Sequence, residues 1–139
     1  MTSTFATPRI LAVLGLAAPL LLAACGSSTP MATEPAYKIA ATPSGEMLTS
    51  NRGMTLYVFA NDTVPGISMC NDACAANWSP LIALDDARPA GKWTVVQRAD
   101  GLKQWAYNGK PLYGWHEDKH AGDMLGDGKA SGAWTIARP

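Results

Sequence analysis

Two cysteines in the middle of the chain are the first residues whose type and spacing could support chemistry. Cys70 and Cys74 have three residues between them. In an exported protein a disulfide is the default state of such a pair. A turn or the start of a short helix brings Cα atoms at this spacing to about 6 Å, within the range of a disulfide. A redox-active or metal-binding pair is the alternative, although a Cys-x-x-Cys spacing would favour it more.

A tyrosine followed five residues later by an aspartate occurs twice. The two pairs are Tyr57 with Asp62 and Tyr113 with Asp118. In one interpretation each aspartate begins a turn by accepting hydrogen bonds from backbone N–H groups, and each tyrosine belongs to the core. In the other, two related carboxylates lie together as ligands or acid–base partners. The sequence gives no distance between the carboxylates, so both interpretations stay open.

The two histidines of the chain, His116 and His120, are four positions apart. On a helix they would share a face and, with Glu117, Met124 or Met69 nearby, could bind zinc or copper. Glycines on both sides and a preceding strand pattern argue against a helix, so we expect two solvent-exposed loop histidines. No phosphate loop, serine-nucleophile motif or His-Glu-x-x-His motif occurs. The sequence therefore predicts no catalytic residue, no metal site, no cofactor and no enzyme.

Both Tyr-Asp pairs belong to one unit that occurs twice. Residues 53–78 align with residues 109–134 at an offset of 56 positions without a gap. Six identities, together with the substitution of Phe59 by Trp115, fix the alignment. A repeat at a fixed offset indicates an internal duplication. The identical pairs are Gly53 and Gly109, Leu56 and Leu112, Tyr57 and Tyr113, Asp62 and Asp118, Gly66 and Gly122, and Trp78 and Trp134.

Turn-forming residues separate short runs of β-branched and aromatic residues. Asp100-Gly101 and Asn108-Gly109 are strong hairpin signals, and they predict a three-stranded meander over residues 93–115. Asn51-Arg52-Gly53 predicts another hairpin, between residues 46–51 and 55–59. These signals recur through the part of the chain that carries the repeats.

One short helix is predicted near Cys70–Trp78, where the sequence is rich in alanine, with Asn71 or Asp72 as its N-cap. The counterpart of this segment in the second unit carries glycines and predicts a loop. We therefore predict an all-β fold, a small single domain of two related hairpin or meander halves. Neither half has enough strands to bury its own apolar face, so we expect a shared aromatic core.

The N-terminal 24 residues have the composition of a bacterial export signal. Residues 10–24 form an apolar stretch that is too short for a comfortable membrane span. The stretch ends in Leu22-Ala23-Ala24-Cys25, which resembles the bacterial lipobox. The resemblance implies that residues 1–24 are a lipoprotein signal peptide and that Cys25 is lipidated, since two or more acyl chains anchor a protein stably. Gly26 favours the periplasmic face of the outer membrane if the cell is Gram-negative.

The rest of the chain divides into a tether and a domain. Residues 25–36 are small, polar and proline-bearing, as in a flexible tether. Residues 37–139 are predicted to form the β domain, with repeat units at about 46–83 and 93–139. Loss of the single arginine of the signal leaves ten basic against eleven acidic residues. This balance predicts no nucleic-acid partner, and the membrane is reached through the lipid anchor alone.

The stretches at residues 53–81 and 98–128 resemble the bacterial secreted-repeat lipoproteins of unknown function, which carry the Tyr-x-x-x-x-Asp motif in tandem. The resemblance places the family motif on Tyr57 with Asp62 and on Tyr113 with Asp118, and its cysteine pair on Cys70 and Cys74. The histidines depart from the family pattern, which weakens a metal role. The family implies no catalytic mechanism.

These observations predict a lipid-anchored cell-envelope protein that binds or scaffolds an unidentified protein or small molecule. We expect the contact to use exposed aromatic side chains and the loops that follow Asp62 and Asp118. The alternative is a redox or metal-handling envelope protein that uses Cys70 and Cys74 with nearby methionines and histidines. An enzyme ranks last of the three.

Overall fold

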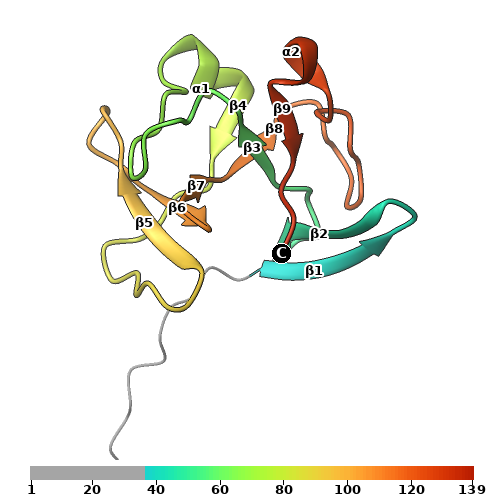
Figure 1. The fold of residues 1–139 in the computed structure, drawn as a ribbon, viewed down its shortest axis with the longest axis horizontal. Coiled ribbons are helices and arrows are strands. Elements are labelled where there is room, and N and C mark those ends of the chain that lie inside the picture. The colour runs from blue at the N-terminus through green and yellow to red at the C-terminus, as the bar shows by residue number, and fades with distance from the viewer. Residues whose placement is uncertain (1–36) are drawn as a thin grey trace, which may run out of the picture. The chain divides into compact units, whose positions relative to one another are not determined.

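The computed structural model describes residues 37–139, so the predicted signal peptide, the tether and Cys25 lie outside the described residues. Nine short strands form three sheets, and two short helices complete the fold of this part of the chain. The all-β prediction is confirmed. Figure 1 shows the elements in chain order, which are β1 (Tyr37–Thr42), β2 (Gly45–Ser50), β3 (Tyr57–Phe59), α1 (Ala73–Asn77), β4 (Trp78–Pro80), β5 (Trp93–Gln97), β6 (Lys103–Tyr107), β7 (Lys110–Pro111), β8 (Tyr113–Trp115), α2 (Lys129–Gly132) and β9 (Trp134–Ile136).

The central sheet is built from strands that alternate between the two repeats. Its order is β4-β8-β3-β9, and every neighbouring pair is antiparallel. Strands β3 and β4 come from the first repeat, whereas β8 and β9 come from the second. All three pairings of this sheet therefore join one repeat to the other, and neither repeat pairs its own two strands.

The registers of these pairings repeat at the sequence offset. Tyr57 lies opposite Ile136 in the β3–β9 pair, and Tyr113 lies opposite Pro80 in the β8–β4 pair. The two tyrosines lie opposite each other where β3 meets β8. Each residue on one side of this contact has its counterpart 56 positions away on the other side. The duplication is thus a pseudo-two-fold arrangement centred on Tyr57 and Tyr113.

Each repeat also contributes a hairpin that flanks the central sheet. Strands β1 and β2 form one, and β5, β6 and the short β7 form the other. The predicted meander continued as a strand to Trp115, but β7 ends at Pro111 and Tyr113–Trp115 belongs to the central sheet. The chain passes from the flanking sheet to the central sheet at Leu112. The Leu112 N–H still donates to the Trp105 carbonyl of β6, whereas the Leu112 carbonyl accepts a hydrogen bond from the Leu81 N–H.

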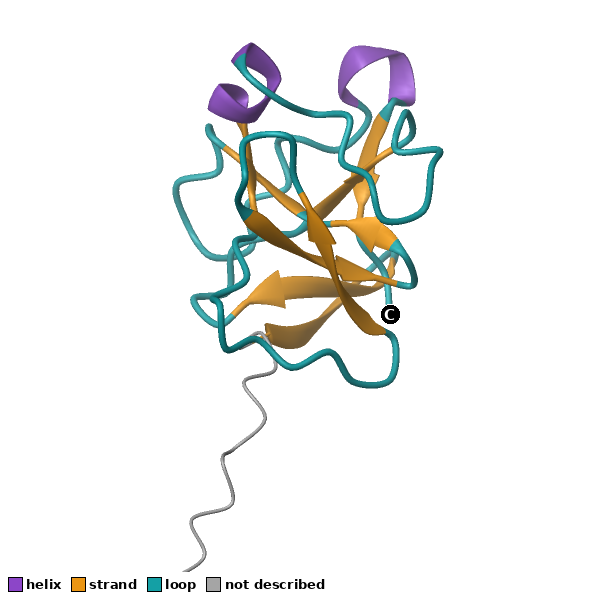
Figure 2. Cartoon of the chain, turned by 90° about the vertical axis from the view of Figure 1, so that its left-hand side faces the viewer, coloured by secondary structure: helices purple, strands orange, loops and turns teal. Residues whose placement is uncertain are grey.

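The two helices lie at one end of the described domain, beyond the strands (Figure 2). Helix α1 occupies the predicted alanine-rich segment, but Asp72 makes no side-chain capping bond there. Helix α2 occupies the segment predicted as a loop, and it is not regular, since Ala130 and Ser131 have left-handed backbone angles. None of the described helices has the length and the apolar composition that crossing a membrane requires.

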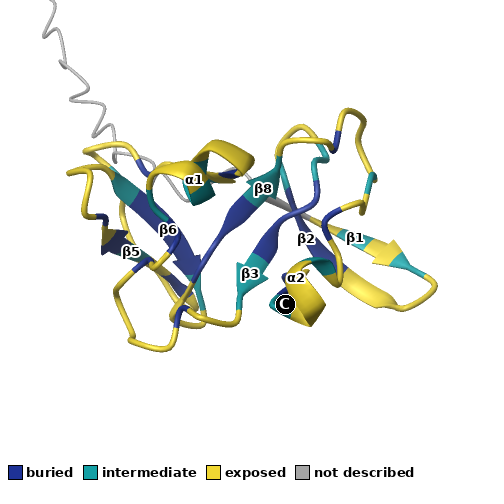
Figure 3. Ribbon diagram, turned by 90° about the horizontal axis from the view of Figure 1, so that it is seen from above, coloured by how far each residue is buried: buried dark blue, intermediate teal, exposed yellow. Residues whose placement is uncertain are grey.

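Two clusters of buried side chains make up the core, and Figure 3 shows that burial concentrates on β2, β6 and the central strands. Aromatic rings dominate the first cluster, which combines Met47, Tyr57, Cys70, Trp78, Tyr113, Trp134 and Ile136. The second combines Leu48, Leu56, Ala83, Trp93, Trp105, Leu112 and Ala137. Both clusters mix residues of the two repeats, so the halves share their core as the sequence predicted.

Because all central pairings cross between the repeats, we predict that neither half folds alone. Residues 37–83 and residues 84–139, produced separately, should lack the near-ultraviolet circular dichroism of packed tryptophans. An equimolar mixture should recover that signal together with a cooperative thermal transition. A cooperative transition in either half by itself would contradict this arrangement.

Candidate functional site

The repeated tyrosines and aspartates meet across the centre of the molecule, each with the partner from the other repeat. The Tyr57 hydroxyl donates a hydrogen bond of 2.7 Å to Oδ2 of Asp118. The Tyr113 hydroxyl donates one of 2.7 Å to Oδ2 of Asp62. The motif that reads Tyr-x-x-x-x-Asp along the sequence is therefore exchanged in space. We call these two hydrogen bonds the reciprocal Tyr–Asp pairs.

The second oxygen of each aspartate closes a loop of its own repeat. Oδ1 of Asp62 accepts the Met69 N–H at 2.7 Å, and Oδ1 of Asp118 accepts the Leu125 N–H at 3.0 Å. Both contacts span seven residues, as the duplication requires. Each carboxylate thus fixes a loop of its own repeat with Oδ1 and accepts a hydrogen bond from the opposite repeat with Oδ2. This geometry matches the interpretation of the aspartates as turn-forming residues, with the added contact between repeats.

The reciprocal Tyr–Asp pairs are shielded from water. Tyr57 and Tyr113 are 0% exposed, while Asp62 is 6% and Asp118 is 7% exposed. Burial raises the pKa of both tyrosine hydroxyls well above their ordinary value, and the hydrogen bond to an aspartate raises each pKa further. Burial also raises the pKa of the Asp62 carboxyl, although the Met69 N–H and the Tyr113 hydroxyl oppose this shift. The four groups are held in place by hydrogen bonds within the buried centre of the described domain.

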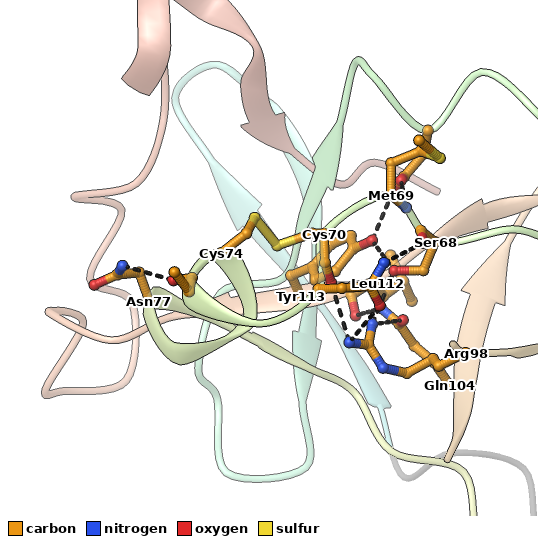
Figure 4. Close-up of a disulfide and its surroundings, with 12 residues drawn as sticks. Ser68, Met69, Cys70, Cys74, Asn77, Arg98, Gln104, Leu112 and Tyr113 are labelled. Carbon is orange, nitrogen blue, oxygen red and sulfur yellow. Dashed lines mark hydrogen bonds between the residues drawn. A yellow bond between two sulfur atoms is a disulfide. The ribbon is translucent and has the colours of Figure 1, made fainter. Parts of the chain in front are cut away.

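A buried arginine extends one of the pairs into a larger network (Figure 4). Ser68 Oγ lies 2.7 Å from the Tyr113 hydroxyl and accepts a hydrogen bond of 2.8 Å from the Arg98 guanidinium. The Arg98 side chain is fully buried, which a guanidinium tolerates only when its N–H groups are paired. Its other acceptors are the Gln104 side chain, the Cys70 carbonyl, the Asn71 side chain and Asp100.

A disulfide joins Cys70 to Cys74 and closes the start of α1. The duplication gives this bond no counterpart, because the equivalent positions are Gly126 and Ala130. A Cβ atom on Gly126 would lie 2.8 Å from the Trp78 ring and 2.9 Å from the Tyr57 ring. The Gly126 N–H instead donates to the Tyr57 hydroxyl at 3.3 Å. A second disulfide is thus sterically excluded in this structure.

Four aromatic rings stack in a row beside the reciprocal Tyr–Asp pairs. Trp78 and Trp134 lie face to face at the centre with 3.7 Å between ring centroids. Phe59 stacks on Trp134 at 4.2 Å, and Trp115 packs on Trp78 at 4.3 Å. Counterparts of the duplication occupy equivalent places in the row. Phe59 and Trp115, the aligned aromatic pair that differs between the repeats, therefore lie at the two ends of the row.

The expectation of an exposed aromatic patch is wrong for residues 39–139, where no aromatic residue is exposed. The aromatics pack against one another in the core, in the stacked row and in edge-to-face contacts with the two motif tyrosines. Aliphatic residues occupy the exposed apolar positions instead. In the loops that follow the motif aspartates these are Val64, Ile67, Met69, Met124 and Leu125.

His120 lies in the second of these loops, His116 lies two residues before the aspartate that begins it, and the two histidines have separate surroundings. His116 Nε2 lies 3.7 Å from Glu117, and His120 Nδ1 lies 3.5 Å from Asp123. The His120 side chain is 86% exposed. Within residues 37–139 no group of three or more His, Cys, Asp or Glu residues is placed to hold a metal ion.

A model of a protein family described as a secreted repeat of unknown function matches this chain twice, at residues 38–82 and 94–138. The chain belongs to this family. The resemblance inferred from the sequence is confirmed, and the description as secreted supports export. The two matched segments are related by the same offset of 56 positions, and the first begins at residue 38, ahead of the residue 46 expected from sequence. Searches of curated proteins and of solved structures found no match.

Sequence reasoning identified the motif residues but not their exchange between repeats. An aspartate five positions after a tyrosine reads as a local pair, and nothing in the linear motif indicates that its partner is 51 or 61 residues away. Arg98 was also missed, because an arginine beside Asp100-Gly101 reads as part of an exposed turn. The signal that could have found it is its position at the end of a strand whose other residues are mostly apolar.

We predict that removing one tyrosine hydroxyl of the reciprocal Tyr–Asp pairs is costly. Tyr57→Phe or Tyr113→Phe leaves a buried carboxylate without one of its donors, which should lower the free energy of unfolding by about 1–3 kcal/mol. Tyr107→Phe is the control, since this half-buried residue packs edge-on against Trp93 and should change stability by less than about 0.5 kcal/mol. Urea titrations measure all three. Equal effects of Tyr57→Phe and Tyr107→Phe would refute the assignment.

The raised tyrosine pKa values predict alkaline instability. Unfolded tyrosines lose their protons above a pH of about 10, whereas the folded Tyr57 and Tyr113 keep theirs. Above this pH the folded state therefore binds more protons than the unfolded state. The free energy of unfolding keeps its full value below this pH and falls above it by about 1.4 kcal/mol per pH unit for each tyrosine. Urea titrations from pH 8 to 11 should show this slope, and Tyr57→Phe should reduce it by about half. An unchanged slope in that variant would contradict the prediction.

Proposed function

We propose that this chain is a lipid-anchored protein of the bacterial cell envelope and acts as a non-enzymatic binding or scaffold module. The lipobox-like segment ending at Cys25 supports the anchor, and membership of a family described as secreted supports export. In this proposal residues 25–36 hold the β domain away from the membrane surface. The acylated Cys25 would keep the domain in the envelope without a membrane-crossing segment.

One observation carries the non-enzymatic part of the proposal. The motif residues, which are the obvious candidates for chemistry, use their polar groups to bind each other across the repeats. A general acid or base needs a titratable group that reaches a substrate and has a pKa near the working pH. The tyrosines are fully buried and their pKa values are shifted away from neutrality. The Tyr-Asp motif then serves to hold the domain in one shape.

The binding surface in this proposal comprises the two loops that the motif aspartates fix. Met69 and Leu125 occupy equivalent positions in the two repeats and are 54% and 58% exposed. Their backbone N–H groups are bound by Asp62 and Asp118, so the side chains are presented from fixed positions. A backbone that is already ordered loses less entropy on binding than that of a mobile loop. A partner with apolar surface fits these loops better than a charged polymer does.

A redox role for the cysteine pair has less support. The Cys70 side chain is buried in the aromatic cluster, and its carbonyl is bound by Arg98. A disulfide used for exchange must be open to attack by a thiolate. We therefore assign the Cys70–Cys74 bond to the stability of the first loop.

The lipid anchor can be tested on the full chain in an expressing bacterium. The unsubstituted chain should sediment with membranes and carry the mass of a diacylglyceryl group and a further acyl chain on its first mature residue. Cys25→Ser removes the sulfur that receives the lipid, so most of the protein should leave the membrane fraction. Cys74→Ser is the matched control and should remain with the membranes. Retention of the Cys25→Ser protein in membranes would contradict the anchor.

A further inference from the structure

Among the described residues, strand β1 is paired on one side only. It forms an antiparallel hairpin with β2, in which Ile39 lies opposite Leu48 and Ala41 lies opposite Glu46. In antiparallel pairs, residues that exchange hydrogen bonds alternate with residues whose N–H and C=O point away from the partner strand. The hydrogen bonds that β2 makes on its other side therefore identify the β1 residues whose backbone N–H and C=O groups point away from β2.

The β2 residues opposite Ile39 and Ala41 bond away from β1. Leu48 donates to the Ala137 carbonyl at 2.8 Å and accepts from the Leu56 N–H at 3.0 Å. The Glu46 carbonyl accepts from the Arg138 guanidinium at 2.9 Å. These are consequently the non-hydrogen-bonded positions of the hairpin, and the N–H and C=O groups of Ile39 and Ala41 point to the outer edge.

This outer edge is open in the part of the chain that the structure describes. Strand β1 lies at the lower edge of the domain in Figure 1, with no described segment below it. Ala41 is exposed, and the Ile39 side chain is 50% exposed. Natural proteins protect such edges with prolines, bulges or charges, because an unprotected edge is a template for a further strand. Lys38 is the one charged residue of β1, and the stretch Ile39–Thr42 carries no charge, proline or bulge.

The equivalent edge in the second repeat differs. Val95 is the counterpart of Ile39 and packs against the second core cluster. At the start of β5 the chain folds back, and the Trp93 N–H donates to the Ala90 carbonyl at 3.0 Å. The β5 edge is therefore partly occupied and less apolar at its surface, so the duplication leaves β1 as the more receptive of the two edges.

We propose that the β1 edge binds the β1 edge of a second copy of this chain, antiparallel and across a two-fold axis at Ile39. Ile39 then exchanges both backbone hydrogen bonds with Ile39 of the second copy, and Tyr37 pairs with Ala41. In this register Lys38 is opposite Ala40, so no lysine lies directly opposite another, and the two lysines of the pair are diagonal neighbours. An antiparallel edge is self-complementary in this way, as a closed two-fold dimer requires.

The pairing converts two two-stranded hairpins into one four-stranded sheet, which is more stable than isolated hairpins. A single shared edge is a small interface, and its affinity in free solution is correspondingly low. The pairing does not depend on the proposed lipid anchor, although anchoring would favour it by confining copies to one surface.

Cysteine cross-linking on the full chain tests the pairing. In a hydrogen-bonded antiparallel pair the two Cα atoms are about 5.5 Å apart, within the range of a disulfide. Ile39→Cys should therefore give a covalent dimer in membranes on mild oxidation. Thr94→Cys, at an exposed position of β5, is the control for random collision and should give at least five-fold less dimer. The unsubstituted chain gives the background from its own cysteines.

A proline at the edge separates strand pairing from mere proximity. Ala41→Pro removes an outward N–H but no bond within the hairpin, so it should reduce the Ile39→Cys dimer at least three-fold. Its near-ultraviolet circular dichroism should match that of the parent and show that the fold is kept. Three results would overturn the proposal: equal dimer from Ile39→Cys and Thr94→Cys, no effect of the proline in a folded protein, or a cross-link to a different protein instead of a second copy.

Discussion

The reciprocal Tyr–Asp pairs are the constraint on which the rest of the structure depends. Each pair uses a charged acceptor inside the core, where a hydrogen bond to a carboxylate is strong and a missing partner is costly. The tyrosine must reach from one repeat into the loop of the other to satisfy that acceptor. The central sheet has the same requirement, since its three pairings all join the repeats. Side-chain and backbone hydrogen bonds therefore impose one arrangement of the two halves.

The two repeats have similar backbone contacts but different side chains around their loops. Both loops after the motif aspartates are closed by the same N–H to carboxylate contact. The first loop is further held by the Cys70–Cys74 disulfide and by the buried Arg98, and the second has Gly126 where the first has Cys70. The first loop is thus reinforced by a disulfide and by hydrogen bonds from an arginine of the second repeat, whereas Gly126, Ala130 and Thr42 stand at the equivalent positions for the second loop. The flanking hairpins differ as well, because β5 packs Trp93 and Val95 into the core while β1 leaves Ile39 exposed.

Much of the fold could be predicted from the sequence, because turn residues and the repeat are local or periodic signals. Asn108-Gly109 adopts the two positive φ values that a tight hairpin needs, and Gly101 adopts one at the preceding turn. The exchange of strands between repeats left no such signal, since a strand of three residues carries too little pattern to indicate its partner. The exposure of aromatics was also unpredictable, because Trp115 reads alike as a binding residue and as the end of a buried stack.

A double-mutant cycle in urea tests the central claim most directly. The cross-repeat cycle combines Tyr57→Phe with Asp118→Asn, and the within-repeat cycle combines Tyr57→Phe with Asp62→Asn. We predict a coupling energy of about 0.5–3 kcal/mol for the first cycle and a value near zero for the second, since only the first pair shares a hydrogen bond. Larger coupling within the repeat than between the repeats would mean that the motif is a local pair, and the reciprocal arrangement would be contradicted.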